Sequence, residues 1–324
     1  MDSEICSRSG QEASALALLQ QGLALAANPL QAAPLLYVRQ WLPRLFAVAL
    51  EQGIEVETVR HLIRKWNIDP ENPTDPRWPW AVKICTLGRF EILLNDAPPE
   101  FARKPPARLL ALLKAIVAFG GTDVPEQRLI DAIWPEDEGD AGAGSLNVAI
   151  TRLRKLLDCP DAIQVSDGKI SLDRKRCWVD ALVFEQAAER LPRGNGFALE
   201  TKNFTTATNA IELYRGSFLS ADTEIWWTIH MRERLRSKLV DLVESLAHHF
   251  ESQQNWECAA QYYQRGIEAD ALFERFHAGL MRSYVGAGRK AEALSAYRRL
   301  RDTLSVVLGI SPSSETQALY QTIC

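Results

Sequence analysis

The sequence has few of the residues that build metal, redox or cofactor sites. Its 324 residues include only six cysteines and five histidines. The cysteines lie far apart, with no C-x-x-C pair and no histidine at metal-ligand spacing. They are Cys6, Cys85, Cys159, Cys177, Cys258 and Cys324. We therefore expect reduced structural thiols, no metal site and no cofactor.

Catalytic motifs and membrane signals are missing as well. The sequence has no G-x-x-x-x-G-K-[ST] loop, dinucleotide fingerprint or nucleophile elbow. The adjacent His248 and His249 cannot both project from one helical face. No apolar run reaches the roughly 18 residues of a membrane span, and the start carries Asp2 and Glu4 instead of a basic leader. These absences argue against an enzyme. We expect a cytoplasmic protein, most simply a bacterial one, that does not contact a membrane.

A basic excess is also lacking, since the net charge is -4. Nucleic-acid-binding proteins often carry positive charge that attracts phosphates, so this balance counts mildly against that class. Charge acts locally, however, because salt screens it beyond about 10 Å. A basic face within an acidic chain therefore stays compatible with the composition. The length suits about two or three domains, and 47% hydrophobic residues can fill their cores.

The N-terminal segment, residues 1–68, reads as helical. Apolar periodicity predicts helices at 13–27, 34–52 and 55–66. Three such helices make a thin core, so they suit either the tail of a larger helical array or a lid. Residues 69–80 follow as a linker, because the segment DPENPTDPRWP contains four prolines and no periodicity. We expect a domain boundary here.

Residues 81–178 combine strands and helices. Alternating apolar residues predict short antiparallel strands around 82–84 and 90–94. A helix opened by Pro105 and Pro106 and a second helix at about 125–133 follow. The acidic, glycine-rich segment 136–144 then reads as a loop. Residues 162–172 form two alternating segments around Asp167-Gly168, a pair that favours a two-residue type I' hairpin.

The helix expected at residues 144–157, GSLNVAITRLRKLL, is the centre of this region. Leu146, Ile150, Leu153 and Leu157 fall on one stripe, and the rest of the circumference is polar and basic. Alone, a basic helix face is most often a solvated surface. Flanked by a sheet and a hairpin, it indicates a winged helix. One face of this helix would pack on the core of the domain, and the other would contact a nucleic acid.

The order of elements and the segment LNVAITRLRK at 146–155 resemble the OmpR/PhoB-type winged-helix domain. The resemblance implies that Asn147, Val148, Thr151, Arg152 and Lys155 face the major groove, with Ser145 and Arg154 near its phosphates. Ser166 and Lys169 at the hairpin tip reach a minor groove or are simply turn residues. The family's aspartate and histidine stand here as Asn147 and Ala149, so the base preference departs from the family's. Arg and Asn are the side chains that bond guanine and adenine bidentately.

Residues 179–324 repeat themselves at a spacing of 34, the tetratricopeptide period. Ala247, Phe250, Ala259 and Tyr263 correspond to Met281, Tyr284, Ala293 and Tyr297. The aromatic residues are expected in the core, with a role in a ligand groove as the alternative. The segments LYRGSFL at 213–219 and AYRRLRDTLSVVLGISPSSETQALY at 296–320 resemble the bacterial transcriptional activator domain of SARP-class antibiotic regulatory proteins. Residues 1–68 resemble the segment before this pair of domains in large MalT-like regulators.

The predicted fold is therefore mainly α, an OmpR-type α+β winged helix followed by a tetratricopeptide-like helical domain. The resemblance implies a sequence-specific transcriptional regulator, most simply an activator, that binds double-stranded DNA. RNA polymerase and a second copy of the chain on repeated DNA sites are the expected partners. The alternative is a helical-repeat adaptor whose winged helix binds protein, and the acidic net charge motivates it.

Overall fold

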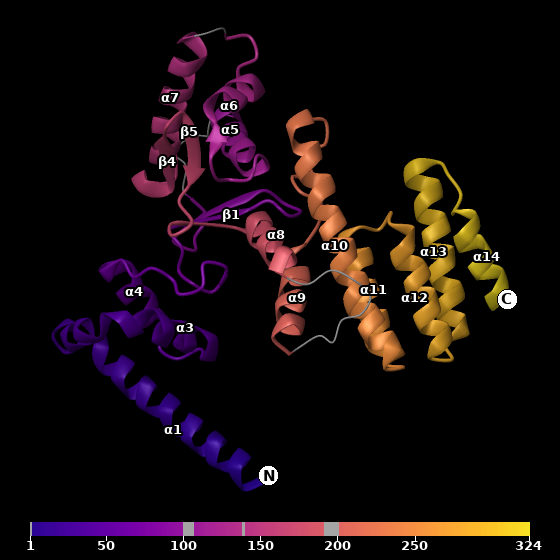
Figure 1. Ribbon diagram of the computed structural model, residues 1–324, viewed down its shortest axis with the longest axis horizontal. Helices are drawn as coiled ribbons and strands as arrows, with labels where there is room; N and C mark the ends of the chain where they lie inside the picture. The colour runs from indigo at the N-terminus through magenta and orange to yellow at the C-terminus, as the bar shows by residue number, and fades with distance from the viewer. Residues whose placement is uncertain (1, 100–106, 138–139, 191–200) are drawn as a thin grey trace.

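The computed structural model describes residues 2–99, 107–137, 140–190 and 201–324. Pro105, Pro106 and part of the acidic segment 136–144 lie outside these residues. Figure 1 shows N-terminal helices, a mixed domain of helices and small sheets, and a row of C-terminal helices in chain order. The mainly α fold predicted from the sequence is confirmed.

The N-terminal helices pack around their own small core. They are α1 (Asp2–Ala26), α2 (Pro29–Ala32), the 3-10 helix η1 (Ala33–Trp41), α3 (Leu42–Gln52) and α4 (Val56–Trp66). The single helix expected over 34–52 is wrong, because the chain kinks at Val38 and α3 begins at Leu42. Pro43 explains the new start: it lacks an N–H and fits the first turn of a helix better than its interior.

The proline-rich segment 69–80 packs against its neighbours instead of spacing them apart. Trp80 is 1% exposed, and its indole Nε1 donates to the carbonyl of Asp75 at 2.8 Å. Trp78 is also buried and joins the core of the N-terminal helices, as does Trp178 from the following domain. Trp178 Nε1 donates to the carbonyl of Thr74 at 3.3 Å. The division at residues 69–80 stays a prediction, but the segment itself is a packed connection.

The central region is a winged helix. Its elements are β1 (Val82–Cys85), β2 (Glu91–Leu94), α5 (Ala107–Ala118), β3 (Val124–Pro125), α6 (Glu126–Ile133), α7 (Asp140–Leu156), the 3-10 helix η2 (Pro160–Ala162), β4 (Ile163–Ser166), β5 (Lys169–Leu172) and β6 (Cys177–Val179). One sheet has the order β2-β1-β6, with β1 antiparallel to β2 and parallel to β6. The other has the order β3-β5-β4 and forms the wing.

The hairpin expected at Asp167-Gly168 is confirmed. Both residues have positive φ, 50° and 69°, as a type I' turn requires, and Ser166 pairs with Lys169 across it. In contrast, the loop expected over 136–144 ends early, since α7 already begins at Asp140. Alanines at 141 and 143 favour the helix, and Gly142 allows it to lie against Ile130 of α6, where a Cβ would stand 2.6 Å from the isoleucine side chain.

The described residues of the C-terminal domain are mainly helical. It contains α8 (Asp180–Arg190), α9 (Thr201–Leu213), α10 (Trp226–Ser252), α11 (Trp256–Ala269), α12 (Glu274–Gly286), α13 (Lys290–Leu308) and α14 (Ser314–Ile323). Helices α10 to α13 stack in sequence as two helix pairs (Figure 1). Ala259, Ala293 and Tyr263 are buried, and the Tyr263 ring lies over Gly279. The tetratricopeptide-like repeat and the core role of this tyrosine are confirmed. Tyr262 and Tyr297 are half-buried and stack on Phe250 and Tyr320.

The winged helix and the C-terminal helices share one continuous core, so the division at 178/179 is not a gap in the packing. Asp180, the first residue of α8, is buried at their junction. Its carboxylate accepts the N–H of Thr86 at 2.8 Å, the Thr86 hydroxyl at 2.7 Å, and the N–H groups of Leu87 and Ala181 at 2.9 and 2.7 Å. Burial raises the pKa of Asp180, and these donors oppose that rise because they favour the ionised form.

We predict that Asp180→Ala lowers the free energy of unfolding by about 3 kcal/mol, because it leaves several buried donors without an acceptor. Urea denaturation followed by tryptophan fluorescence measures the change. Asp161→Ala, at an exposed aspartate of the same region, is the control and should change stability by less than about 0.5 kcal/mol. Equal stability of the two variants would contradict a structural role for the junction.

Candidate nucleic-acid interface

Helix α7 is amphipathic in the manner expected from its sequence. Leu146, Ile150, Leu153 and Leu157 are all buried in the winged-helix core. Helix α7 lies on the side of this domain that is away from α10 to α14 (Figure 1). The helix therefore docks through one stripe and leaves the other accessible to a large partner.

The five side chains predicted to face a major groove lie on this accessible face. Asn147, Thr151, Arg152 and Lys155 are exposed, and Val148 is 51% exposed despite being apolar. Thr151 donates its hydroxyl to the carbonyl of Asn147 at 3.0 Å. Within the described residues, neither Arg152 nor Lys155 forms an ion pair. The structure thus brings the five together as a surface with two unpaired cations.

Ser145 and Arg154, predicted to lie near phosphates, have partners inside the protein. Ser145 donates to the carboxylate of Asp137 at 2.9 Å. Arg154 is half-buried, and its Nε and one terminal nitrogen donate to the carbonyl of Ile163 at 3.0 and 2.7 Å. Ile163 begins the wing, so this fork joins the last turn of α7 to β4. The geometry gives Arg154 a positioning role for the wing.

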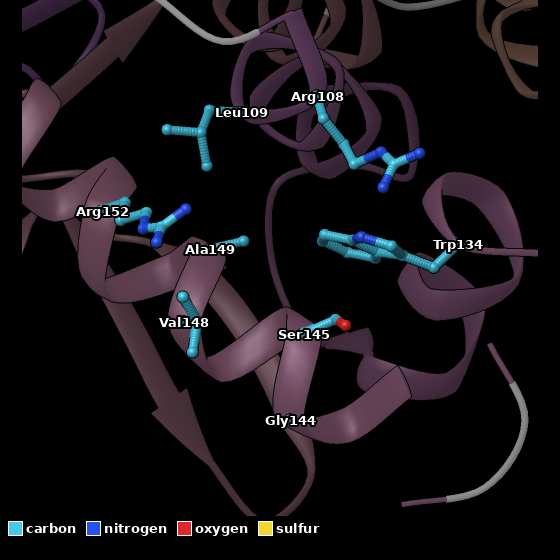
Figure 2. A pocket seen from close by; sticks show the side chains of 8 residues that line it. All are labelled: Arg108, Leu109, Trp134, Gly144, Ser145, Val148, Ala149 and Arg152. Atoms are coloured by element: carbon cyan, nitrogen blue, oxygen red, sulfur yellow. The ribbon is translucent and has the colours of Figure 1, made fainter. Parts of the chain in front are cut away.

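A hollow of about 430 Å³ opens beside the exposed face of α7. Figure 2 shows the Arg108 guanidinium and the Trp134 indole on one side of it and Arg152 on the other. Val148 and Ala149 lie along its floor on α7 (Figure 2). Ala149 is itself buried, so this departure from the family pattern changes the hollow and not the exposed surface.

Sequence reasoning missed Arg108 and Trp134 as members of this surface. Arg108 lies in the first turn of α5, and Trp134 follows α6 directly. The only available signal was their place at the ends of the two helices that precede α7. Their approach to Arg152 depends on how those helices cross, which a pattern within one helix does not reveal.

The wing tip offers a smaller polar surface. Ser166 and Lys169 are both exposed and face each other across the hairpin. Ser166 donates to the carboxylate of Asp167 at 3.2 Å, whereas Lys169 has no ion pair among the described residues. Lys169 is therefore the free cation of the tip.

The described residues offer little for metal or thiol chemistry. No group of histidine, cysteine, aspartate and glutamate there could hold a metal ion. Burial raises the pKa of the Cys85 thiol to about 11 and raises that of Cys177 further, so both favour the unreactive protonated form. Among the described helices, none has the length and apolar character needed to cross a membrane.

Parts of this chain are similar to known proteins. Residues 179–324 match the family model of the bacterial transcriptional activator domain. The regulatory protein AfsR of Streptomyces griseus is 26% identical over 266 residues, which are 79% of this chain and 26% of AfsR. The regulatory protein DnrI of Streptomyces peucetius is 27% identical over 243 residues, 68% of this chain and 84% of DnrI. The chain thus spans about a quarter of the length of AfsR.

One solved structure is also similar, that of Mycobacterium tuberculosis EmbR in complex with a low-affinity phosphopeptide. It shares 19% identity and a TM-score of 0.48, covering 75% of this chain and 65% of that chain. At this level the two folds are only loosely comparable.

The chain from Val82 to Cys324 thus combines a winged helix with tetratricopeptide-like helices. Residues 179–324 are a bacterial transcriptional activator domain, and with the winged helix before them they give the chain the arrangement of a SARP-class regulator. The resemblance to the activator domain of SARP-class proteins, seen in the sequence, is confirmed.

Arg154 and Arg152 lie two residues apart on α7, and only Arg154 has a partner that suggests a structural role. We predict that Arg154→Ala lowers the free energy of unfolding by about 2 kcal/mol, because it removes two charged hydrogen bonds to Ile163. Arg152→Ala, on the same helix but without an internal ion pair, should change it by less than about 0.5 kcal/mol. Urea denaturation of both variants checks this, and the reverse order of stability would refute the positioning role of Arg154.

Proposed function

We propose that this chain regulates transcription by binding double-stranded DNA in a sequence-specific way, with the exposed face of α7 in the major groove. The observation that carries the proposal is Arg152. It is exposed, forms no ion pair within the described residues, and lines the hollow beside α7 together with Val148 and Arg108. A cation presented in this way has no structural task in the free protein.

The remaining side chains divide by chemistry. Asn147 and Arg152 can bond adenine and guanine bidentately, and Val148 can contact a thymine methyl group. Lys155, Lys169 and Arg108 serve as phosphate contacts, which fix position without reading sequence. Ser145 and Arg154 act through Asp137 and Ile163, holding the start of α7 and the wing in place. Asn147 is the position where this protein's base preference departs from its family's.

The partners follow from the size of the surface. One winged helix covers few base pairs, so tight binding calls for two copies on a repeated site. The matched domain is described as a transcriptional activator, which supports activation through contact of the C-terminal helices or the acidic segment 136–144 with RNA polymerase. No step of this function requires a bound cofactor.

The adaptor alternative keeps one supporting observation, the net charge of -4. On that hypothesis the exposed face of α7 binds a protein, and the chain has no measurable affinity for DNA. The local surface favours DNA, because Arg108, Arg152, Lys155 and Lys169 place four cations there, against which Asp167 adds a carboxylate at the wing tip.

We predict that Arg152→Ala lowers affinity for DNA selected by the protein from a random pool by roughly 10- to 100-fold, from the 1–3 kcal/mol of a bidentate base contact. Fluorescence anisotropy with selected and scrambled duplexes measures the loss, and circular dichroism should show unchanged helix content. Arg298→Ala, at an exposed arginine on α13, is the matched control and should bind as the parent does. Undiminished specific binding by the Arg152 variant would overturn the proposed reading face.

Lys155→Ala should behave differently, because a phosphate contact carries no sequence information. We predict equal weakening on selected and scrambled DNA and a salt slope that becomes shallower by about 0.9. Titration at several salt concentrations measures both. If the parent chain shows no DNA binding at any salt concentration, the adaptor hypothesis stands in its place.

A further inference from the structure

The surface of α1 is unusual for a protein in which 24% of residues are charged. Between Glu12 and Arg39 the sequence contains no Asp, Glu, Lys or Arg. Much of this stretch is nevertheless exposed: Leu18 is 68% and Leu25 is 59% exposed. Figure 1 shows α1 extending away from α3 and α4 towards the N-terminus. A solvent-exposed helix normally carries charge, so this surface needs another explanation.

One face of α1 is already used. Leu23 and Ala26 are buried in the core of the N-terminal helices. A second, separate stripe comprises Ala15, Leu18, Gly22 and Leu25, and all four residues are exposed. Their spacings of three, four and three residues are those of a heptad seam, the pattern by which one helix packs along another. Small and large residues alternate along it.

The stripe is complementary to itself in an antiparallel arrangement. Suppose that a two-fold axis crosses the helix pair at the level of residue 20, on the side of the stripe. Leu18 of one copy then lies opposite Gly22 of the other, and Leu25 lies opposite Ala15. Each leucine thus meets a small residue, which lets two helices approach closely. Gly22 leaves room for this contact, since a Cβ built on it would meet nothing within 4 Å.

Charge and symmetry point to the same partner. Two copies of an uncharged surface meet without like-charge repulsion, and antiparallel helices oppose their macrodipoles favourably. A self-complementary patch on both members is the signature of a two-fold interface. An unrelated partner would have to match the small-large alternation independently.

We propose that α1 is a self-association surface, in which Ala15, Leu18, Gly22 and Leu25 pack antiparallel against the same residues of a second copy. With the axis level with Gln20, residues 14–26 of the two helices lie side by side over about 20 Å. So short an overlap buries less than the roughly 1,200 Å² of a standard specific interface, so we expect a weak, reversible dimer. This inference does not rest on the proposed DNA contact, which lies in another domain.

Sedimentation equilibrium of the full chain without DNA, at about 1 to 100 µM, tests the proposal. The parent should show a reversible monomer–dimer equilibrium. Leu18→Lys should raise the dimer dissociation constant at least about tenfold, because it places two cations beside the axis. Gln20→Lys is the matched control: it adds the same charge on the same helix but points about 200° away from Leu18, and it should leave the constant unchanged.

Two further variants separate specific packing from general stickiness. Gly22→Leu adds apolar area to the surface. If association were unspecific, this variant would strengthen it. If Gly22 packs against Leu18 of the partner, the added side chain should weaken the dimer. A chain carrying Leu18→Lys and Leu25→Lys, mixed with one carrying Leu18→Glu and Leu25→Glu, should form a heterodimer although neither forms a homodimer.

Three outcomes would overturn the proposal. They are a chain that stays monomeric at the highest concentration, a dimer that Gly22→Leu strengthens, and a monomeric chain that floats with phosphatidylcholine–phosphatidylglycerol vesicles. The last outcome would make the stripe a membrane contact. None of these results would bear on DNA binding, which anisotropy measures separately.

Discussion

The buried carboxylate of Asp180 holds the two main domains in one relative orientation. Asp180 lies in the first turn of α8. Its carboxylate accepts the N–H groups of Thr86 and Leu87, which directly follow β1. The same short segment is also engaged from the other side. The N–H of Leu219 donates to the carbonyl of Thr86 at 2.8 Å, and that of Gly88 donates to the carbonyl of Ser217 at 3.1 Å. Rotation of one domain against the other would leave these buried groups unpaired, at a cost of about 1–3 kcal/mol each.

This junction gives a physical meaning to the segment LYRGSFL, which resembles the family in sequence. Its Phe218 is fully buried and forms a bridge to Leu87, and Gly88 and Gly216 allow the two backbones to approach closely. Arg232 in α10 donates to the carbonyl of Phe218 at 3.1 Å and so holds the loop in place. The LYRGSFL segment therefore secures the docking of the helical domain onto the winged helix. The direction in which α7 presents its exposed face is fixed by the same contacts.

Features that depend on neighbours in sequence were predictable, and those that depend on neighbours in space were not. The stripe of α7, the Asp167-Gly168 hairpin and the 34-residue repeat each follow from a local period. The parallel pairing of β6 with β1 joins residues more than ninety positions apart in the chain, and a three-residue strand has too little pattern to reveal it. The burial of Trp80 could not be predicted for a related reason: the prolines before it indicate a linker, and its burial comes from packing on the N-terminal helices.

The candidate site shows the same limit at the scale of single side chains. Arg152 and Arg154 are two residues apart and therefore point to different sides of α7, a difference of about 200°. Both are arginines, yet Arg152 is exposed at the surface and Arg154 donates hydrogen bonds to the carbonyl of Ile163. The two departures from the family pattern also divide in this way. Asn147 is exposed, whereas Ala149 is buried and, being small, leaves the hollow between Arg152 and Arg108 open. A larger side chain at 149 would fill the space into which both arginines extend. In the proposed function, Asn147 would therefore contact a base directly, and Ala149 would act through the freedom that it leaves to the two arginines.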